Sequence, residues 1–116
     1  MAVLVISFVL VLFLGGCIAS YDYNVKGEWN YELFASDGHA YDKGTVTFTG
    51  NPMAGYYDML NYDNQDFSGA FTVKGEEIRL TGSVNWKGTL SDENTMSGDW
   101  WDNIGTEGTF TAARQE

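Results

Sequence analysis

Cys17 is the residue whose chemistry the sequence indicates most clearly, because it is the only cysteine among 116 residues. It follows Gly15 and Gly16, which are small enough to lie extended in the groove of a peptidase. It also ends an uncharged, mostly apolar run that begins at Met1, and such a segment ending in small residues is the layout of a secretory signal. A thiol is a nucleophile, and with no second cysteine it forms no disulfide within the folded part. We therefore expect export of the chain.

Leu14-Gly15-Gly16-Cys17 resembles the lipobox of bacterial lipoproteins. The resemblance implies that residues 1–16 are a signal peptide, that cleavage occurs before Cys17, and that its thiol accepts a diacylglyceryl group with fatty acyl chains such as palmitate. The mature protein would then be held at a membrane of the cell envelope by this lipid anchor, with residues 17–24 as a short tether. Ile18, in place of an aspartate, implies the outer membrane if the envelope is Gram-negative.

An uncleaved membrane helix is the alternative interpretation of the same segment. Residues 1–19 are uncharged and about long enough to span a bilayer. No lysine or arginine precedes Lys26, whereas a signal segment normally carries positive charge at its start. Both interpretations leave residues 25–116 as one compact domain.

The rest of the chain gives little support for catalysis. His39 is the only histidine and lies near Asp37 and Asp42, where a metal site is conceivable but a solvated turn is more typical. No serine, cysteine or lysine lies in a recognisable nucleophile motif with a base. A second group offers hard oxygen ligands for calcium, with a spacing that matches no EF-hand loop: Asp58, Asp63, Asn64 and Asp66. We predict a protein that is not an enzyme and has no metal or cofactor.

The charge balance excludes one class of partner. Sixteen acidic residues against six basic ones give a formal net charge of −10. Nucleic acid binding needs a basic surface, and an anionic membrane surface repels such a protein. We therefore expect no nucleic acid partner, and a charged protein partner would be cationic. The same charge also serves simply to keep a soluble surface monomeric.

The elements that carry the side chains are expected to be short strands. After Cys17 no segment shows a convincing helical period, and apolar residues alternate with polar ones in runs such as 27–33, 45–49 and 67–74. Clusters of Gly, Asn and Asp separate the runs as turns. One run, 53–62, is rich in aromatic residues and its inward face is ambiguous. Eight short strands joined by hairpin-length turns predict an all-β fold, a small antiparallel up-and-down barrel, with a β-sandwich as the alternative.

Gly27 and Trp29 in the first run, together with Arg114 in the last, resemble the signature of the calycin superfamily of lipocalins, fatty-acid-binding proteins and avidins. In that family the arginine lies across the tryptophan and closes one end of the barrel. Arg114 is in phase with Phe110 and Ala112, so it is expected to point inward. The pair would then form a cation–π contact and leave guanidinium donors for nearby carbonyls.

Aromatic residues make up 16% of the chain. Those expected to point inward are Trp29, Tyr31, Phe48, Phe71, Trp86, Trp100 and Phe110. The interior of an eight-stranded barrel is either filled by side chains or holds one small ligand. Both alternatives fit the strand pattern. If there is a ligand, the candidate lining residues are Tyr31, Phe48, Phe71, Trp86, Trp100 and Phe110.

These observations support two functions of different kinds. The first is a lipid-anchored envelope protein whose lipocalin-like barrel binds a small hydrophobic or aromatic ligand. The second is a protein-binding lipoprotein with a filled barrel, either an inhibitor of a cationic wall-degrading enzyme or an envelope-assembly factor. A surface protein without any ligand is a third interpretation. A cavity larger than a water molecule is the feature that the first function requires.

Overall fold

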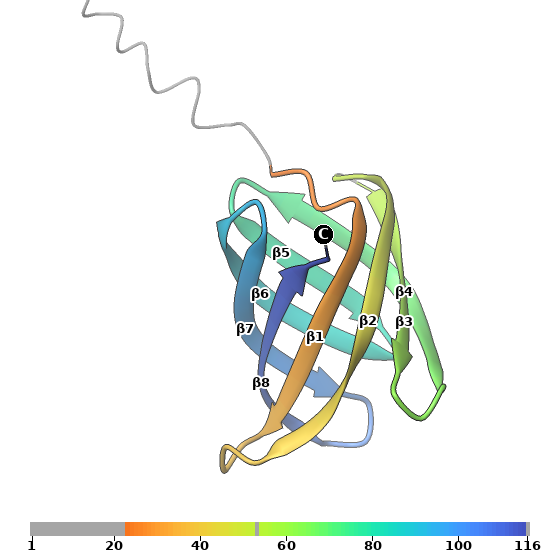
Figure 1. Ribbon diagram of the computed structural model, residues 1–116, viewed down its shortest axis with the longest axis vertical. Coiled ribbons are helices and arrows are strands. Elements are labelled where there is room, and N and C mark those ends of the chain that lie inside the picture. The colour runs from red at the N-terminus through yellow and green to blue at the C-terminus, as the bar shows by residue number, and fades with distance from the viewer. Residues whose placement is uncertain (1–22, 53, 116) are drawn as a thin grey trace, which may run out of the picture.

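The computed structural model describes residues 23–52 and 54–115. The strands within these ranges (Figure 1) are β1 (Gly27–Ala35), β2 (Ala40–Asn51), β3 (Ala54–Asn61), β4 (Asp66–Lys74), β5 (Glu77–Gly82), β6 (Val84–Asp92), β7 (Thr95–Asp102) and β8 (Glu107–Arg114). Each strand pairs with its neighbours in sequence, and β8 pairs antiparallel with β1. The sheet is therefore a closed up-and-down barrel, which confirms the predicted fold and excludes the sandwich. Closure also removes the exposed edges of an open sheet.

The predicted signal peptide, Cys17 and most of the predicted tether lie outside the described residues. Within the described ranges, no helix has the length and apolar character needed to cross a membrane. Contacts with the barrel already begin at Tyr23, whose amide donates to the carbonyl of Gly75 at 3.2 Å. The folded domain thus extends at least two residues further toward the N-terminus than its predicted start at residue 25.

Strand β1 shows why the alternating sequence folds in this way. Trp29, Tyr31 and Leu33 are buried inside the barrel, whereas Asn30 and Glu32 between them are exposed. A strand turns successive side chains to opposite faces, so one closed sheet separates an apolar interior from a polar exterior. The same alternation recurs around the barrel, which makes the interior one continuous apolar cluster.

The run whose inward face was ambiguous forms β3. Tyr57 and Met59 are buried, while Tyr56 and Leu60 are exposed on the outer face. The hydroxyl of Tyr57 stabilises this arrangement, because it donates to the carbonyl of Val84 at 2.6 Å and accepts from the amide of Val84 at 3.1 Å. Both contacts cross the barrel from β3 to the start of β6.

Glycines inside the strands provide space for the interior rings. A Cβ atom at Gly88 would lie 2.6 Å from Cζ of Phe110, and one at Gly69 would lie 2.7 Å from Cε2 of Tyr57. Both distances are shorter than carbon atoms tolerate, so a larger residue at either position would force a ring to move. The glycines in the aromatic-rich strands therefore allow rings to lie directly on the backbone.

One end of the barrel is closed by Arg114. Its guanidinium carbon lies 4.8 Å from the centroid of the Trp29 ring. The guanidinium also donates to three carbonyls, those of Asn24 and Lys26, both at 2.6 Å, and that of Glu93, at 2.9 and 3.1 Å. These bonds hold the segment that precedes β1 across the end of the barrel.

The segment held by Arg114 also covers Trp29 from the other side. Val25 is buried, and its carbonyl accepts a hydrogen bond from the indole nitrogen of Trp29 at 2.8 Å. Gly27 has a φ of +118°, a backbone conformation that favours glycine. A Cβ at this position would lie 3.4 Å from Nη1 of Arg114, so the guanidinium lies directly against the glycine. All three residues of the expected closing signature thus lie together at this end.

Candidate ligand cavity at the barrel mouth

The opposite end of the barrel contains a cavity of about 370 Å³. It lies among the ends of β1, β3 and β7 and the starts of β4 and β6, in the lower part of Figure 1. Its walls are apolar side chains from five strands: Leu33, Met59, Phe67, Val84 and Trp100. Small-molecule sites in proteins typically measure about 300–1,000 Å³ and have such apolar walls. The size and lining therefore suit one small ligand.

Trp100 provides a flat wall of this cavity. Its indole nitrogen donates to the carbonyl of Phe34 at 2.9 Å, which fixes the plane of the ring. The ring of Tyr41 lies 5.0 Å from the Trp100 ring, centroid to centroid, with an angle of 34° between the planes. Because Tyr41 also lines the cavity, two aromatic rings border the space at its rim.

The rim itself is polar on the side of β2. The side-chain nitrogen of Asn61, Nδ2, donates to the carboxylate of Asp42 at 3.0 Å and to the side-chain oxygen of Gln65 at 2.9 Å. The side-chain oxygen of Asn61 accepts from the backbone amides of Asp63 and Gln65 at 3.0 and 2.9 Å. This network joins β2 to the turn between β3 and β4, and it holds the carboxylate of Asp42 at the cavity.

Asp102 contributes a second carboxylate to the rim, from the end of β7. Its Oδ1 accepts hydrogen bonds from the amides of Ile104 and Thr106, both at 3.0 Å. The turn that these bonds shape brings Ile104 to the cavity, where it is 86% exposed. No lysine or arginine is among the described residues that line the cavity.

Tyr31 is the unusual member of the lining. It is only 2% exposed, and its hydroxyl has no hydrogen-bond partner within the described residues. The indole nitrogen of Trp86 is buried and unpartnered in the same way, and the two rings meet edge to face with centroids 5.8 Å apart. Buried polar groups of native proteins are nearly always paired, so two adjacent exceptions call for an explanation.

Other buried aromatic donors of the same barrel provide an internal comparison. Trp29 donates to Val25, Trp100 donates to Phe34, and Tyr57 donates to Val84. The sequence thus pairs its structural donors and leaves unpaired the hydroxyl of Tyr31, which lines the cavity, and the indole nitrogen of Trp86, whose ring packs against Tyr31. Burial raises the pKa of Tyr31, and the charge of Asp42 raises it further. The hydroxyl is therefore a neutral donor at physiological pH.

This contrast predicts opposite stability effects for two matched substitutions. Tyr31→Phe should leave the free energy of unfolding unchanged or raise it by up to about 1 kcal/mol, because a buried hydroxyl is removed without loss of a bond. Tyr57→Phe should lower it by about 1–3 kcal/mol, because Val84 loses its partner. Urea unfolding followed by tryptophan fluorescence measures both. Equal destabilisation of the two variants would mean that the Tyr31 hydroxyl is bonded in the free protein.

The six predicted lining residues do not all reach the cavity. Tyr31 and Trp100 line it. The other four are buried in the packed interior: Phe48, Phe71, Trp86 and Phe110. Phe48 and Phe71 meet edge to face at 5.0 Å, and Trp86 stacks on Phe110 at 4.0 Å. The barrel is thus filled over part of its length and hollow at its mouth, so each of the two alternatives from the sequence describes part of it.

Several residues of the cavity are not among the lining residues predicted from the sequence. Leu33 and Phe67 were in the inward phase of their strands, and that phase was the available signal. Met59 lay in the ambiguous run, so its direction was not determined. Asp42 and Asp102 belong to acidic segments next to turns, and composition alone does not distinguish a carboxylate on a cavity rim from ordinary surface charge.

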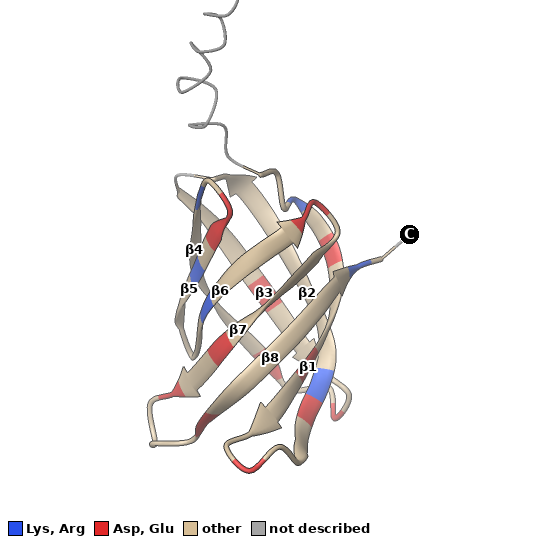
Figure 2. Ribbon diagram, turned by 90° about the vertical axis from the view of Figure 1, so that its left-hand side faces the viewer, with Lys and Arg blue, Asp and Glu red and all other residues tan. Residues whose placement is uncertain are grey.

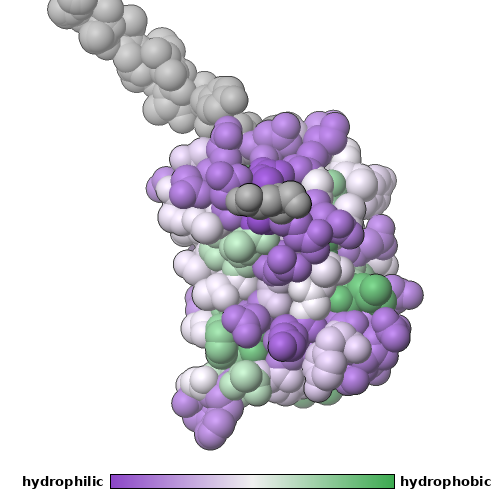
Figure 3. All heavy atoms as spheres, in the orientation of Figure 1, coloured by the Kyte–Doolittle hydropathy of each residue, from purple (hydrophilic) through white to green (hydrophobic). Residues whose placement is uncertain are grey.

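The turns around the mouth are acidic (Figure 2). The acidic residues in these turns or next to them are Asp37, Asp42, Asp63, Asp66, Asp102 and Glu107. Lys43 follows Asp42 but points outward and is exposed. The face drawn in Figure 3 is mostly hydrophilic, with isolated apolar side chains. The mouth therefore combines an apolar cavity with a negatively charged surround.

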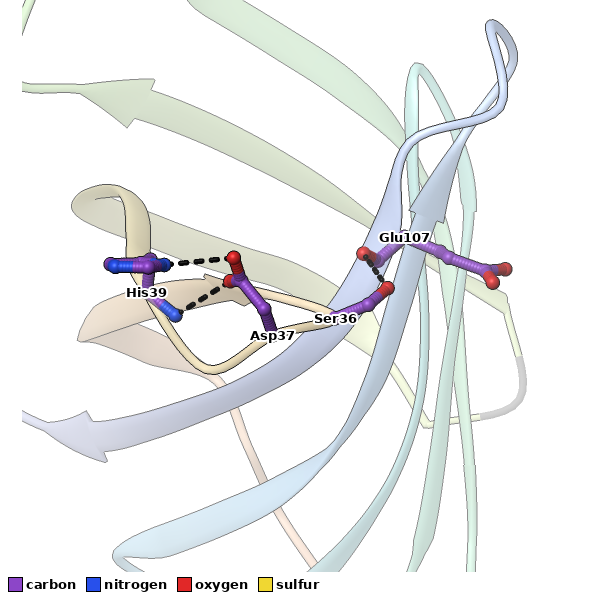
Figure 4. A network of polar contacts seen from close by, with 4 residues as sticks. All are labelled: Ser36, Asp37, His39 and Glu107. Atoms are coloured by element: carbon purple, nitrogen blue, oxygen red, sulfur yellow. Dashed lines mark hydrogen bonds and ion pairs between the residues drawn. The ribbon is translucent and has the colours of Figure 1, made fainter.

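The loop that contains the only histidine lies at this end but shows no catalytic arrangement (Figure 4). The ring of His39 contacts Asp37 at 2.8 Å, and both side chains are mainly exposed. Hydrogen bonds from His39 lower the pKa of Asp37. The hydroxyl of Ser36 donates instead to the carbonyl of Glu107. Across residues 23–52 and 54–115, no group of three His, Cys, Asp or Glu side chains is arranged to hold a metal.

These features define the class of the molecule as a small closed β-barrel with an apolar cavity at one end. No protein-family model and no curated protein matches the sequence. Two solved structures share its fold. A redesigned β-barrel has a TM-score of 0.63 and 22% identity, over 79% of this chain and 92% of that one. A de novo designed fluorescence-activating β-barrel has a TM-score of 0.55 and 20% identity, over 78% of this chain and 93% of that one.

Proposed function

We propose that this protein is a lipid-anchored protein of the cell envelope whose calycin-like barrel binds one small hydrophobic or aromatic molecule in the mouth cavity. The observation that carries the proposal is the apolar cavity of about 370 Å³ lined by Tyr31, a residue with a buried and unpartnered hydroxyl. An unpaired donor costs stability in the free protein. A ligand that supplied an acceptor would remove that cost, which favours binding.

Two further findings support this function. One solved structure with this fold is described as a de novo designed fluorescence-activating β-barrel. The described chain also enters at the closed end, where Arg114 holds Asn24. A lipid at Cys17, a few residues earlier, would therefore attach near the closed end and leave the mouth accessible from the aqueous side.

A direct test uses N-phenyl-1-naphthylamine, an uncharged probe that fluoresces in apolar surroundings. We expect saturable binding to the native barrel at one site. Met59→Trp, which fills the cavity, should abolish this binding. Leu60→Trp is the matched control, because the neighbouring side chain points outward and is 40% exposed. Equal binding by both variants would place the probe on the outer surface and contradict the proposal.

The natural ligand is accessible by native mass spectrometry of the protein purified from its own host. A co-purifying molecule that is absent from the Met59→Trp variant would identify the chemical class of the ligand.

The anchor is tested separately by labelling cells with radioactive palmitate. We expect the label and membrane association in the full chain, and loss of both in Cys17→Ser.

The acidic mouth also favours a second function, in which a cationic protein such as a wall-degrading enzyme binds at this end. Complementary charge speeds such association and weakens with salt. A pull-down from envelope extract at low salt, repeated at high salt, tests this function. Capture that persists at high salt would contradict it.

A further inference from the structure

The mouth cavity has an internal polarity that constrains what it binds. Its lining includes a neutral hydroxyl donor on Tyr31 and two carboxylates at the rim, on Asp42 and Asp102. The surfaces between are apolar or aromatic. A ligand that satisfies all of these groups together has different chemistry at its two ends.

The inner end requires an acceptor. Tyr31 is 2% exposed and its hydroxyl lacks a partner, and the unpartnered indole nitrogen belongs to the ring in contact with it. A phenol kept neutral and an indole N–H both donate. Within the cavity, a carbonyl oxygen or an unprotonated ring nitrogen of a ligand would pair with the Tyr31 hydroxyl, whereas an alkyl end would leave the cost of that unpaired donor in place.

The outer end favours a positive charge. Asp102 uses Oδ1 for the amides of its own turn, and within the described residues its Oδ2 has no hydrogen bond. Asp42 is held at the rim by Asn61. No lysine or arginine among the described lining residues neutralises these two carboxylates. An ammonium group beside the free Oδ2 of Asp102 would be stabilised by charge-assisted hydrogen bonds.

We propose that the ligand is a flat, apolar molecule with a hydrogen-bond acceptor at its inner end and an amine cation at its outer end. The aromatic walls formed by Trp100 and Tyr41 account for the flat body and add cation–π attraction at the rim. This inference rests on the proposed ligand-binding function and specifies the chemical class of the ligand.

Three commercial probes of similar size separate the contribution of the hydrogen-bond acceptor from that of the ammonium group. 7-Aminomethyl-4-methylcoumarin has both a carbonyl acceptor and a distant ammonium group. 4,7-Dimethylcoumarin has only the acceptor, and 2-naphthylmethylamine has only the ammonium group. With the native barrel, we expect the first probe to bind about tenfold more tightly than the second and about fivefold more tightly than the third.

Two substitutions should remove these preferences separately. Asp102→Asn keeps the Oδ1 acceptor of the turn but removes the charge, so it should reduce the preference for ammonium to about threefold or less. Asp58→Asn is the matched control, because Asp58 lies exposed on the outer face of β3, and it should leave the preference near tenfold. Tyr31→Phe should remove the preference for the coumarin carbonyl and leave that for ammonium. Thermal melting of each variant establishes that it is folded.

The outcomes distinguish this inference from the function on which it depends. Loss of each preference in the matching variant supports it. Equal affinity for all three probes, with binding still blocked by Met59→Trp, would overturn the proposed ligand class and leave the ligand-binding function intact. Failure of the three probes and of N-phenyl-1-naphthylamine to bind would overturn both.

Discussion

We expect Trp29→Ala to lower the free energy of unfolding by about 3–5 kcal/mol, measured by urea unfolding. Trp29 is fully buried and meets Phe48 edge to face with ring centroids 6.3 Å apart. Its substitution would leave a large void at a position where the strands of a closed barrel cannot move together to fill it. It would also leave the carbonyl of Val25 without the indole donor.

Arg114, which lies over the ring of Trp29, provides a second test of how this end of the barrel is closed. Arg114→Ala should cost less than Trp29→Ala, about 1–3 kcal/mol, because three carbonyls lose donors but regain contact with water. The double variant should be less destabilised than the sum of the two single variants, because each one alone already removes the cation–π contact. Strict additivity would mean that the two side chains close the barrel independently.

The fold was largely predictable because one closed sheet imposes a single rule, in which successive residues alternate between interior and surface. That rule is sufficient in β1, where Trp29 and Tyr31 alternate with polar neighbours. It fails in β3, because Tyr56 and Tyr57, like Met59 and Leu60, are apolar or aromatic on both faces. The structure places Tyr57 inward, and its hydroxyl bonds to Val84. That partner is far away in the sequence, so no local pattern reveals it.

The site was less predictable than the fold, because alternation gives the direction of a side chain but not its height along the barrel. Phe110 and Trp100 share the inward direction, yet only Trp100 reaches the mouth cavity. Height depends on the stagger between neighbouring strands, which places Trp100 opposite Gly108 and Phe110 opposite Gly98. Stagger is a property of the whole closed sheet. The lining of the cavity therefore follows from the three-dimensional pairing and not from the composition of any one strand.

Adjacent tryptophans at the end of β7 offer the sharpest test of the cavity, because they differ only in the face that they occupy. Trp100→Ala should lower the free energy of unfolding by about 3–5 kcal/mol, since it removes a buried ring and its bond to Phe34. It should also abolish binding of N-phenyl-1-naphthylamine, because the flat wall of the cavity is lost. Urea unfolding and a fluorescence titration measure the two effects.

Trp101→Ala is the control for this pair. Its side chain is 40% exposed, and its backbone carbonyl keeps the hydrogen bond from Asn85 whatever side chain is present. We expect a change in stability within about 0.5 kcal/mol and unaltered probe affinity. If Trp101→Ala weakened probe binding as strongly as Trp100→Ala, the ligand would lie on the outside of β7. The mouth cavity would then be a feature of packing without a role in binding.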